Sequence, residues 1–471
     1  MKRYERFADQ LATLMTRGVL APGERLPSVR SASQTHGISP STVFQAYYLL
    51  ESRGLIEARE RSGYFVREPA RARDAAPLLA PLEGTEVAVS DLVYSVLQSL
   101  QDPAIVPFGS AFPSPDLFPL ARLARSMARS MAHGLRDLPA QDLTAYVTPG
   151  HPELRRQIAR RYGLAGMPEV GEELVITHGA LEALNLGLQS LTRPGDLVAV
   201  ESPAFYASLQ VLERLQLKAV EIPVDAERGL NLDALEEALS RLPIKACWFM
   251  SGLQNPTGVS LDDSAQQRLY GLLQRHQVPL LEDDVYAELY SGSEPHRPVK
   301  RFDRDGLVLH CGSFSKCLAP GYRIGWIAAG RQAGAVARLR LMTTITPSMP
   351  AQAALADYLQ HGGYDRHLRR LRLSLDRQRQ AMLTAARRYF PADTHVSRPQ
   401  GGYFLWFELP TRVDSLALYR QALAEGISLA PGPIFSAQQG FRHCIRLNCG
   451  HPWDTRSEAA MARLGELLKA F

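Results

Sequence analysis

Ser313-Phe314-Ser315-Lys316, followed by Pro320-Gly321-Tyr322-Arg323-Ile324-Gly325-Trp326, is the most informative segment of this chain. It places one lysine beside two serine hydroxyls, with an arginine seven residues further on. Pyridoxal 5'-phosphate (PLP) needs an amine for a Schiff base, and donors with a fixed positive charge for its phosphate. The segment therefore predicts a PLP site, with Lys316 as the Schiff-base amine and Ser313, Ser315 and Arg323 around the phosphate.

Short apolar runs elsewhere predict the sheet that would carry this site. The runs 197–200, 246–250 and 307–310 are separated by helical patterns such as 230–242. This alternation is typical of buried parallel strands with crossover helices, which place ligands at the strand ends. A further expected strand, 175–177, turns directly into a helix. The amides at the start of that helix are predicted to bind the phosphate, and they belong to Gly179, Ala180 and Leu181.

Five side chains complete the predicted cofactor site. Phe205 is placed to stack on the pyridine ring, although a phenylalanine alone also suits a core. Asn255, in Asn-Pro-Thr-Gly, offers an amide to the ring hydroxyl or simply forms a turn, and Tyr286 can share that hydroxyl. Asp283 ends an expected strand and would keep the pyridine nitrogen protonated, which makes the ring an electron sink. Arg446 can pair with a carboxylate through two hydrogen bonds.

The N-terminal segment carries the whole net charge of the chain. Residues 1–73 contain 12 basic and seven acidic residues, a net charge of +5, whereas the remainder contains 41 of each. A solvated basic arm and a phosphate-binding surface both agree with this charge. The local sequence pattern favours the phosphate-binding surface.

That pattern predicts three helices and a hairpin. The first helix covers residues 4–16, and the second begins with Pro27 in its first turn and ends at His36-Gly37. Ser39 caps the third helix, whose buried stripe is expected to consist of Val43, Ala46, Tyr47 and Leu50. Two strands, 55–58 and 63–66, flank a basic tip. The arrangement is a winged helix-turn-helix, which would place its third helix in the DNA major groove.

The same residues resemble the GntR family of transcription regulators over nearly all of residues 3–67. The matching elements include Leu20-x-Pro22-Gly23-x-x-Leu26-Pro27-Ser28-x-Arg30 and Ser62-Gly63-x-Phe65-Val66. The resemblance implies that the following residues meet DNA: Arg30, Ser39, Ser41, Thr42, Arg61, Ser62 and Gly63. Short hydroxyl side chains at a helix N-terminus agree with this role, and Ser39 can also act as a cap. Because Pro40 offers no hydrogen bond and Phe44 is apolar, we expect few base contacts from this helix.

The rest of the chain, about 91–471, resembles the fold-type I aminotransferases through the ordered set of residues around Lys316. The resemblance implies an α/β fold, with a large domain built on a mainly parallel sheet and a smaller α+β domain. It also implies that Tyr146 reaches the phosphate across a dimer interface. The chain departs from the family pattern at Leu181-Glu182, where polar amides are common, and at Phe205, where a tyrosine is common.

The predicted domains are therefore a winged helix-turn-helix over 1–67, a flexible linker over 68–90 and an aminotransferase-like domain over 91–471. This combination resembles the MocR-type regulators of the GntR family. It implies a head-to-tail homodimer that binds a double-stranded DNA operator and senses PLP, or an amine or amino-acid effector. A working aminotransferase for 2-aminoadipate-like or aromatic amino acids is the alternative, because Lys316, Asp283 and Arg446 are all present.

Composition limits the remaining possibilities. The chain has 471 residues, of which 45% are hydrophobic and 21% charged, and no apolar run approaches 18 residues. We therefore expect no membrane span. The five cysteines are odd in number and lack the spacing of metal ligands, which favours reduced thiols in a cytoplasm and no metal site.

Overall fold

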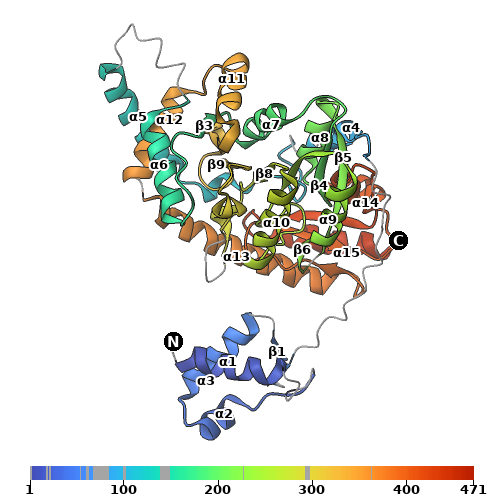
Figure 1. The fold of residues 1–471 in the computed structure, drawn as a ribbon. Coiled ribbons are helices and arrows are strands. Elements are labelled where there is room, and N and C mark those ends of the chain that lie inside the picture. Colours follow the sequence, from blue (N-terminus) through green and yellow to red (C-terminus); the bar gives the residue numbers. More distant parts are fainter. Residues whose placement is uncertain are drawn as a thin grey trace. The chain divides into compact units, whose positions relative to one another are not determined.

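The computed structural model describes residues 3–16, 20, 23–52, 55–59, 63–66, 84–98, 102–137, 149–225, 227–291, 297–361 and 363–471. The chain divides into two compact units, Met1–Pro81 and Leu82–Phe471, and each has its own hydrophobic core (Figure 1). No helix in the described ranges is both long and apolar enough to cross a membrane.

The N-terminal unit is the predicted winged helix-turn-helix. Its elements are α1 (Arg3–Thr16), α2 (Val29–His36), α3 (Pro40–Ser52), β1 (Ile56–Arg59) and β2 (Gly63–Val66). The strands β1 and β2 form an antiparallel hairpin. Gly37 ends α2 in the left-handed conformation, at φ 61°, which a glycine adopts without strain.

The start of α2 differs from the prediction for Pro27. The helix begins at Val29, and the hydroxyl of Ser28 accepts a hydrogen bond from the amide of Ser31, so Ser28 is the cap and Pro27 precedes it. A serine hydroxyl satisfies one of the free amides of the first turn, which a proline cannot do. The carbonyl of Pro27 instead accepts a hydrogen bond from the buried hydroxyl of Tyr47, over 2.7 Å. This bond fixes the chain before α2 against α3.

The predicted stripe of α3 is confirmed. Val43, Ala46, Tyr47 and Leu50 are all fully buried, and they pack with Phe7 and Leu11 of α1. The amide of Thr42 donates to the hydroxyl of Ser39 over 3.2 Å, as expected of a helix cap. One face of α3 therefore holds the unit together, and the opposite face is exposed.

The second unit is built on a mixed sheet of eight strands. They are β3 (Leu174–Thr177), β4 (Leu197–Ser202), β5 (Lys218–Asp225), β6 (Gly229–Leu230), β7 (Ile244–Phe249), β8 (Leu280–Asp283), β9 (Val308–Ser313) and β10 (Gly325–Ala328). Their order in the sheet is β3-β10-β9-β8-β7-β4-β5-β6. Neighbours from β9 to β5 are parallel, whereas β10 runs antiparallel to both β3 and β9. The parallel part agrees with the alternation seen in the sequence.

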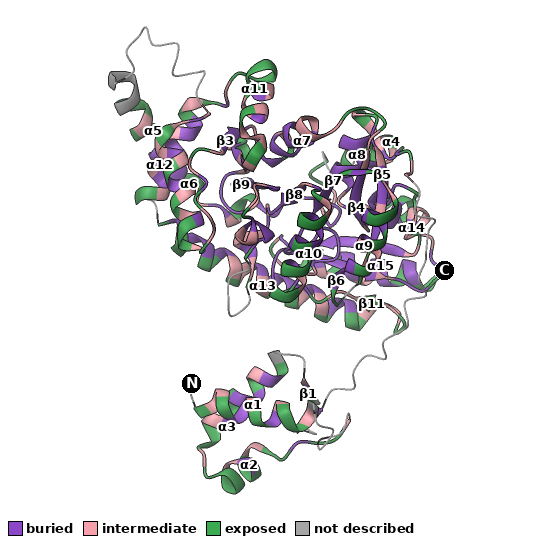
Figure 2. Ribbon diagram, viewed as in Figure 1, coloured by how far each residue is buried: buried purple, intermediate pink, exposed green. Residues whose placement is uncertain are grey.

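Helices cover both faces of this sheet, as Figures 1 and 2 show. The helices described before the smaller sheet are α4 (Ser90–Gln98), α5 (Leu120–Asp137), α6 (Pro152–Leu164), α7 (Ala180–Leu191), α8 (Tyr206–Arg214), α9 (Leu232–Arg241), α10 (Asp263–His276), α11 (Ala333–Thr343) and α12 (Met349–His361). Of these, α4 packs on α8, and α5 packs on α12, whereas the others include those that contact the sheet directly. Val198 and Val200 of β4 belong to one core with α7, whereas Ala199 between them belongs to a second core with α9 and α10. Alternate side chains of a strand point to opposite faces, so both faces are apolar here.

A smaller antiparallel sheet forms the C-terminal part. Its strands are β11 (His395–Val396), β12 (Phe404–Glu408), β13 (Ala430–Pro431) and β14 (Cys444–Asn448), and its helices are α13 (Tyr364–Tyr389), α14 (Ser415–Ala424) and α15 (Thr455–Lys469). The strand order is β11-β12-β14-β13. This is the smaller α+β domain that the resemblance implied.

Residues 84–90, which the sequence assigned to the linker, pack against the large sheet. Thr85 exchanges backbone hydrogen bonds of 2.9 Å with Ala219 on β5, and the amides of Val89 and Ser90 donate to the carboxylate of Glu213. Val87 and Val89 are buried. The second unit thus begins before residue 91, because the side chains of Val87 and Val89 pack at the edge of its core.

Candidate functional site

The predicted site residues gather at one edge of the large sheet. Strands β4, β7, β8 and β9 are parallel, so their carboxyl ends meet at the same edge. The loops that follow them carry, in turn, Phe205, Asn255, Tyr286 and Lys316. This placement agrees with the expectation that the ligand lies at the ends of the parallel strands, although more than 100 residues separate Phe205 from Lys316.

Strand β10 brings the predicted phosphate residues together. Its first residue, Gly325, pairs with Thr177 on β3 and with Ser313 on β9. A Cβ at Gly325 would lie 2.4 Å from the backbone carbon of Gly179, so the glycine is what lets the start of α7 approach. The turn before β10 carries Arg323 to the same place. The start of α7 and the turn before β10 are far apart in the sequence, yet they form one cluster.

Within this cluster Arg323 is held from two sides. Its Nη1 donates to the hydroxyl of Ser315 over 3.1 Å, and a Cβ on Gly179 would lie 2.8 Å from its Nη2. The hydroxyl of Ser313 accepts from the amide of Ser315 over 3.0 Å. Gly179 caps α7 at φ 80°, which leaves the first amides of the helix pointing out of its N-terminus. The guanidinium, two hydroxyls and a helix N-terminus together suit an anion.

The side chains of Leu181 and Glu182 add no donor to this cluster, as the sequence suggested. Leu181 is 43% exposed, and Glu182 accepts a hydrogen bond from the amide of His178 over 2.6 Å. A hollow of about 400 Å³ opens beside them, lined by His178, Leu181, Glu182, Asn185, Leu186, Gln189, Arg214, Arg323 and Thr343. The hollow is open to solvent and leaves Arg323 reachable from outside.

Lys316 lies between aromatic rings and backbone carbonyls. Its Nζ donates to the carbonyl of Ala111 over 2.9 Å and lies 3.8 Å from the ring centroid of Phe112. Burial and the positive charge of Arg446 lower the pKa of Lys316 to about 7, although Asp283 acts in the opposite direction. The amine is therefore uncharged and nucleophilic just above neutral pH.

Asp283 is buried at the end of β8. Neither of its carboxylate oxygens has a well-formed hydrogen bond to any described residue, although the indole of Trp248 is close enough to lower its pKa. Burial raises the pKa of Asp283 to about 7, and the neighbouring Asp284 adds to that effect. A buried carboxylate of this kind needs a cationic donor. The unsatisfied oxygens of Asp283 are therefore available to such a donor.

Asn255, Tyr286 and Arg446 form a connected group beside Lys316. Arg446 is fully buried, and its Nη1 donates to the side-chain oxygen of Asn255 over 3.0 Å. The amide nitrogen of Asn255 in turn lies 3.4 Å from the hydroxyl of Tyr286. Arg446 also stacks over Phe404, with its guanidinium carbon 4.1 Å from the ring centroid. Its Nε has no partner among the described residues and remains available to a carboxylate.

One feature was not found from the sequence: a segment that we name the strap, Gly109–Phe112. The carbonyls of the strap accept hydrogen bonds from five side chains: Lys316, Tyr403, Arg446, Asn448 and His451. Lys316 and Arg446 both bind this short backbone segment, which therefore borders the site. Because the acceptors are carbonyls, which every residue has, no side-chain pattern could have revealed the strap.

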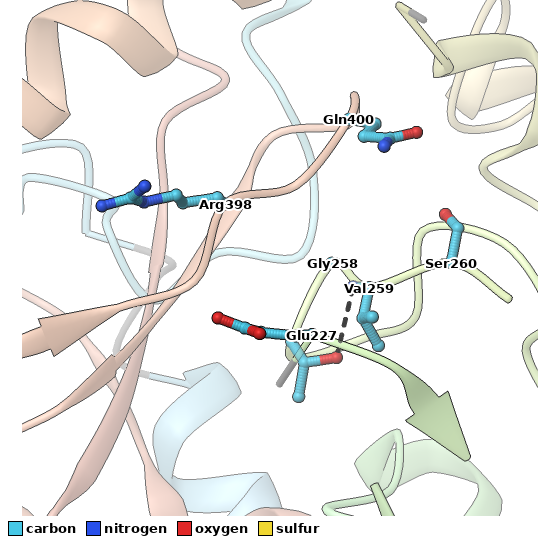
Figure 3. A pocket seen from close by; sticks show the side chains of 7 residues that line it. Glu227, Gly258, Val259, Ser260, Arg398 and Gln400 are labelled. Carbon is cyan, nitrogen blue, oxygen red and sulfur yellow. Dashed lines mark hydrogen bonds between the residues drawn. The ribbon is translucent and has the colours of Figure 1, made fainter. Parts of the chain in front are cut away.

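A second missed residue, Gln254, connects two loops of the site. Its amide nitrogen donates to the carbonyl of Pro203 over 2.8 Å, and its oxygen accepts from the hydroxyl of Thr257 over 2.6 Å. The loop of Phe205 is thus tied to the loop of Asn255. Figure 3 shows a small polar pocket of about 80 Å³ behind this second loop, lined by Glu227, Thr257, Gly258, Val259, Ser260, Arg398 and Gln400. None of the predicted cofactor residues lines this pocket.

The predicted DNA-binding residues lie on the N-terminal unit. Arg30 is exposed on the first turn of α2. The hydroxyl of Ser39 lies 2.9 Å from that of Ser41 and 2.8 Å from that of Thr42, so all three meet at the start of α3. Gly63 begins β2 at φ 98°, and the Arg25 side chain lies next to it. Arg61, Ser62 and Tyr146 lie outside the described residues, and their roles remain predictions.

The described residues include no group of three or more His, Cys, Asp or Glu side chains that could hold a metal ion. All five cysteines are buried and unpaired. The site itself supplies an amine, a carboxylate, two guanidinium groups and several hydroxyls.

Comparison with known proteins identifies both units. The family described as "Bacterial regulatory proteins, gntR family" matches residues 3–66, and "Aminotransferase class I and II" matches residues 120–462. The HTH-type transcriptional regulator YdcR of Escherichia coli (strain K12) is 46% identical over 469 residues, which cover 100% of this chain and 99% of YdcR.

Solved aminotransferase structures share the fold of the second unit. The multiple substrate aminotransferase of Thermococcus profundus aligns with a TM-score of 0.74 at 27% identity, covering 80% of this chain and 94% of its own. LysN, an alpha-aminoadipate aminotransferase of Thermus thermophilus, was solved with N-(5'-phosphopyridoxyl)-L-leucine. It aligns with a TM-score of 0.72 at 30% identity, and the alignment covers 80% of this chain and 94% of LysN. This chain belongs to the GntR-family transcription regulators of the MocR type, in which a winged helix-turn-helix DNA-binding domain is fused to an aminotransferase class I and II domain.

Proposed function

We propose that this regulator binds PLP at Lys316, and that PLP or an amine or amino-acid effector in the same site changes its affinity for operator DNA. The observation that carries the proposal is the strap, whose carbonyls accept hydrogen bonds from both Lys316 and Arg446. A ligand that engages the amine or the guanidinium competes directly with these bonds. The strap would therefore respond to occupancy of the site.

The surrounding residues fit PLP. The orphaned carboxylate of Asp283 suits a protonated pyridine nitrogen, and the cluster of Gly179 and Arg323 suits a phosphate. When bound, PLP supplies an aldehyde and an electron-withdrawing ring. Lys316 would provide the amine that bonds to the aldehyde, and its pKa of about 7 keeps that amine reactive near neutral pH.

An amino acid would use the same residues differently from PLP alone. Its carboxylate would pair with Nε and Nη2 of Arg446 and displace the strap carbonyls from Nη2. Its amine would compete with Lys316 for the aldehyde and so release the lysine. The strap lies near the start of the second unit, and the chain leads from it back through α4 and Thr85 toward the DNA-binding unit. A change at the strap therefore has a continuous covalent route to the N-terminal unit.

Borohydride reduction tests the cofactor assignment. The protein would be loaded with PLP, reduced, digested and mapped by mass spectrometry. We expect the added mass on Lys316, absent from Lys316→Ala and retained in the control Lys245→Ala, because Lys245 is exposed and lies outside the site. An amino acid that enters the site should lower the fraction fixed to Lys316. Labelling that is equal in Lys316→Ala and in the unaltered protein would refute the assignment.

A second candidate function is transamination of 2-aminoadipate-like or aromatic amino acids. It is favoured by the joint presence of Lys316, Asp283 and Arg446 around one site. The 2-aminoadipate transaminase of Thermus thermophilus is 30% identical over 381 residues. Turnover measured with amino-acid and keto-acid pairs, beside a DNA-binding assay on the same preparation, separates the two functions.

We further propose a head-to-tail homodimer, in which Tyr146 of the partner subunit reaches the phosphate cluster. Exposed apolar side chains support it: Leu181 lines the hollow beside Arg323, and Met342, on the helix that contributes Thr343, is 79% exposed. Mixing Lys316→Ala with Tyr146→Phe protein tests the arrangement. Hybrid dimers should recover one intact PLP site, and a mixture that binds no more PLP than the separate variants would contradict it.

A further inference from the structure

One face of α3 exposes two aromatic side chains beside polar ones, and the only charged residue of the helix, Glu51, is exposed near its end. Phe44 is 54% exposed and Tyr48 is 66% exposed, one helical turn apart, and Gln45 between them is exposed as well. Ser41 lies on the same face, at the end nearest the cap. The opposite face is fully buried, so neither aromatic ring belongs to the core of the unit.

Two exposed aromatic rings on one short helix indicate a surface that binds another molecule. Pro40–Ser52 contains no Lys or Arg, although residues 1–73 carry a net charge of +5. The positive charge that attracts phosphates therefore lies outside α3, on exposed residues such as Arg25 and Arg30. The face of α3 is left to contact something other than phosphate.

The major groove of DNA offers groups that match this face. Thymine alone presents a methyl group there, and apolar side chains such as phenylalanine contact it. Glutamine forms two hydrogen bonds with adenine, whereas guanine is read by Arg or Lys and cytosine by Glu or Asp. The start of α3, with its cluster of three hydroxyls, is the end that a recognition helix turns toward the bases.

We propose that α3 reads A·T base pairs, with Phe44 against a thymine methyl group and Gln45 hydrogen-bonded to an adenine. Tyr48 extends the apolar contact one turn further along the groove. This inference goes beyond DNA binding itself, because it assigns the base preference and the residues that determine it. It also revises the expectation of few base contacts: an apolar residue reads DNA through a methyl group rather than through a hydrogen bond.

Selection from a randomised duplex library gives the first test. The full-length protein should enrich A·T pairs at two or more adjacent positions, and Phe44→Ala should relax the preference for thymine at one of them. Leu14→Ala is the matched control, since Leu14 is 37% exposed but lies on α1. Enrichment of G·C pairs at the positions that respond to Phe44→Ala would overturn the proposal.

Deoxyuridine provides the sharper test, because it lacks only the methyl group of thymine. Replacing the thymine read by Phe44 should weaken binding of the selected duplex about fourfold, the effect of one buried methyl group. Phe44→Ala should bind the two duplexes equally, and Phe44→Leu should keep part of the difference. Phe44→Ala should also leave the salt dependence of binding unchanged, because no phosphate contact is lost.

The outcomes are distinct. Equal affinity of the unaltered protein for thymine and deoxyuridine at every selected position would show that the α3 face does not read the methyl group. The same conclusion would follow if Phe44→Ala, with an unchanged melting temperature, kept the full thymine preference. In that case the aromatic face would be a protein contact, and α3 variants would change the oligomeric state or stability instead.

Discussion

Gly179→Ala tests the phosphate cluster most closely. Gly179 has φ 80°, and a Cβ at this position would lie 2.8 Å from Nη2 and 3.2 Å from Cζ of Arg323. An alanine therefore forces the guanidinium away from the start of α7. It also places a non-glycine residue in a conformation that costs about 1–3 kcal/mol.

The expected loss in PLP affinity follows from the displaced guanidinium. A hydrogen bond to a charged group contributes about 1.5–3 kcal/mol, so PLP should bind roughly 10- to 150-fold more weakly. Absorbance titration of the apo protein with PLP measures this directly. Unphosphorylated pyridoxal should bind Gly179→Ala as well as it binds the unaltered protein, because the substitution disturbs only the contact between Arg323 and the phosphate.

Gly163→Ala is the matched control for this variant. Gly163 lies near the end of α6 at a negative φ, and a Cβ there meets nothing within 4 Å. Alanine should leave PLP binding unchanged and raise stability slightly, because it favours the helix. If Gly179→Ala bound PLP within twofold of the unaltered protein, the phosphate could not lie between α7 and Arg323.

Three further predictions concern other contacts. Tyr47→Phe removes the buried hydrogen bond to Pro27, so the N-terminal unit should lose about 1–2 kcal/mol of unfolding free energy in a denaturant titration; an unchanged midpoint would contradict this. Attachment of PLP needs the uncharged amine of Lys316, so its rate should rise as the pH rises through about 7, the lowered pKa of that amine. Arg446→Gln removes a charge that lowers this pKa, and the midpoint should move to higher pH; a midpoint that stays in place would refute the electrostatic coupling. Arg30→Ala should weaken DNA binding and reduce the slope of log affinity against log salt by about one in fluorescence anisotropy, and an unaltered slope would mean that Arg30 contacts no phosphate.

The sequence predicted features that depend on local pattern. The burial of β4 on both faces and the cap of Ser39 follow from neighbouring residues, and both are present. Lys316 and Arg323 could be assigned together because one turn carries both. The predicted start of α2 was wrong, because Ser28 caps the helix and Pro27 therefore lies before its first turn.

Long-range features could not be predicted in the same way. One such feature is the pairing of β10 with β3, which lies about 150 residues earlier in the chain. The partners of the strap are side chains from distant segments, and its own contribution is backbone. The exposure of Phe44, by contrast, agrees with the local pattern, since the sequence placed this residue outside the buried stripe of α3.

The central claim is that occupancy of the Lys316 site and DNA binding are coupled. The most direct measurement is the affinity of the full-length protein for its selected duplex in three states: apo, PLP-loaded, and PLP-loaded with an amino acid that lowers borohydride labelling of Lys316. We predict that the affinity differs between states by about 1–3 kcal/mol, and that DNA changes the affinity for the ligand by the same factor. Equal DNA affinity in all three states would contradict the account and leave a PLP protein merely tethered to a DNA-binding domain.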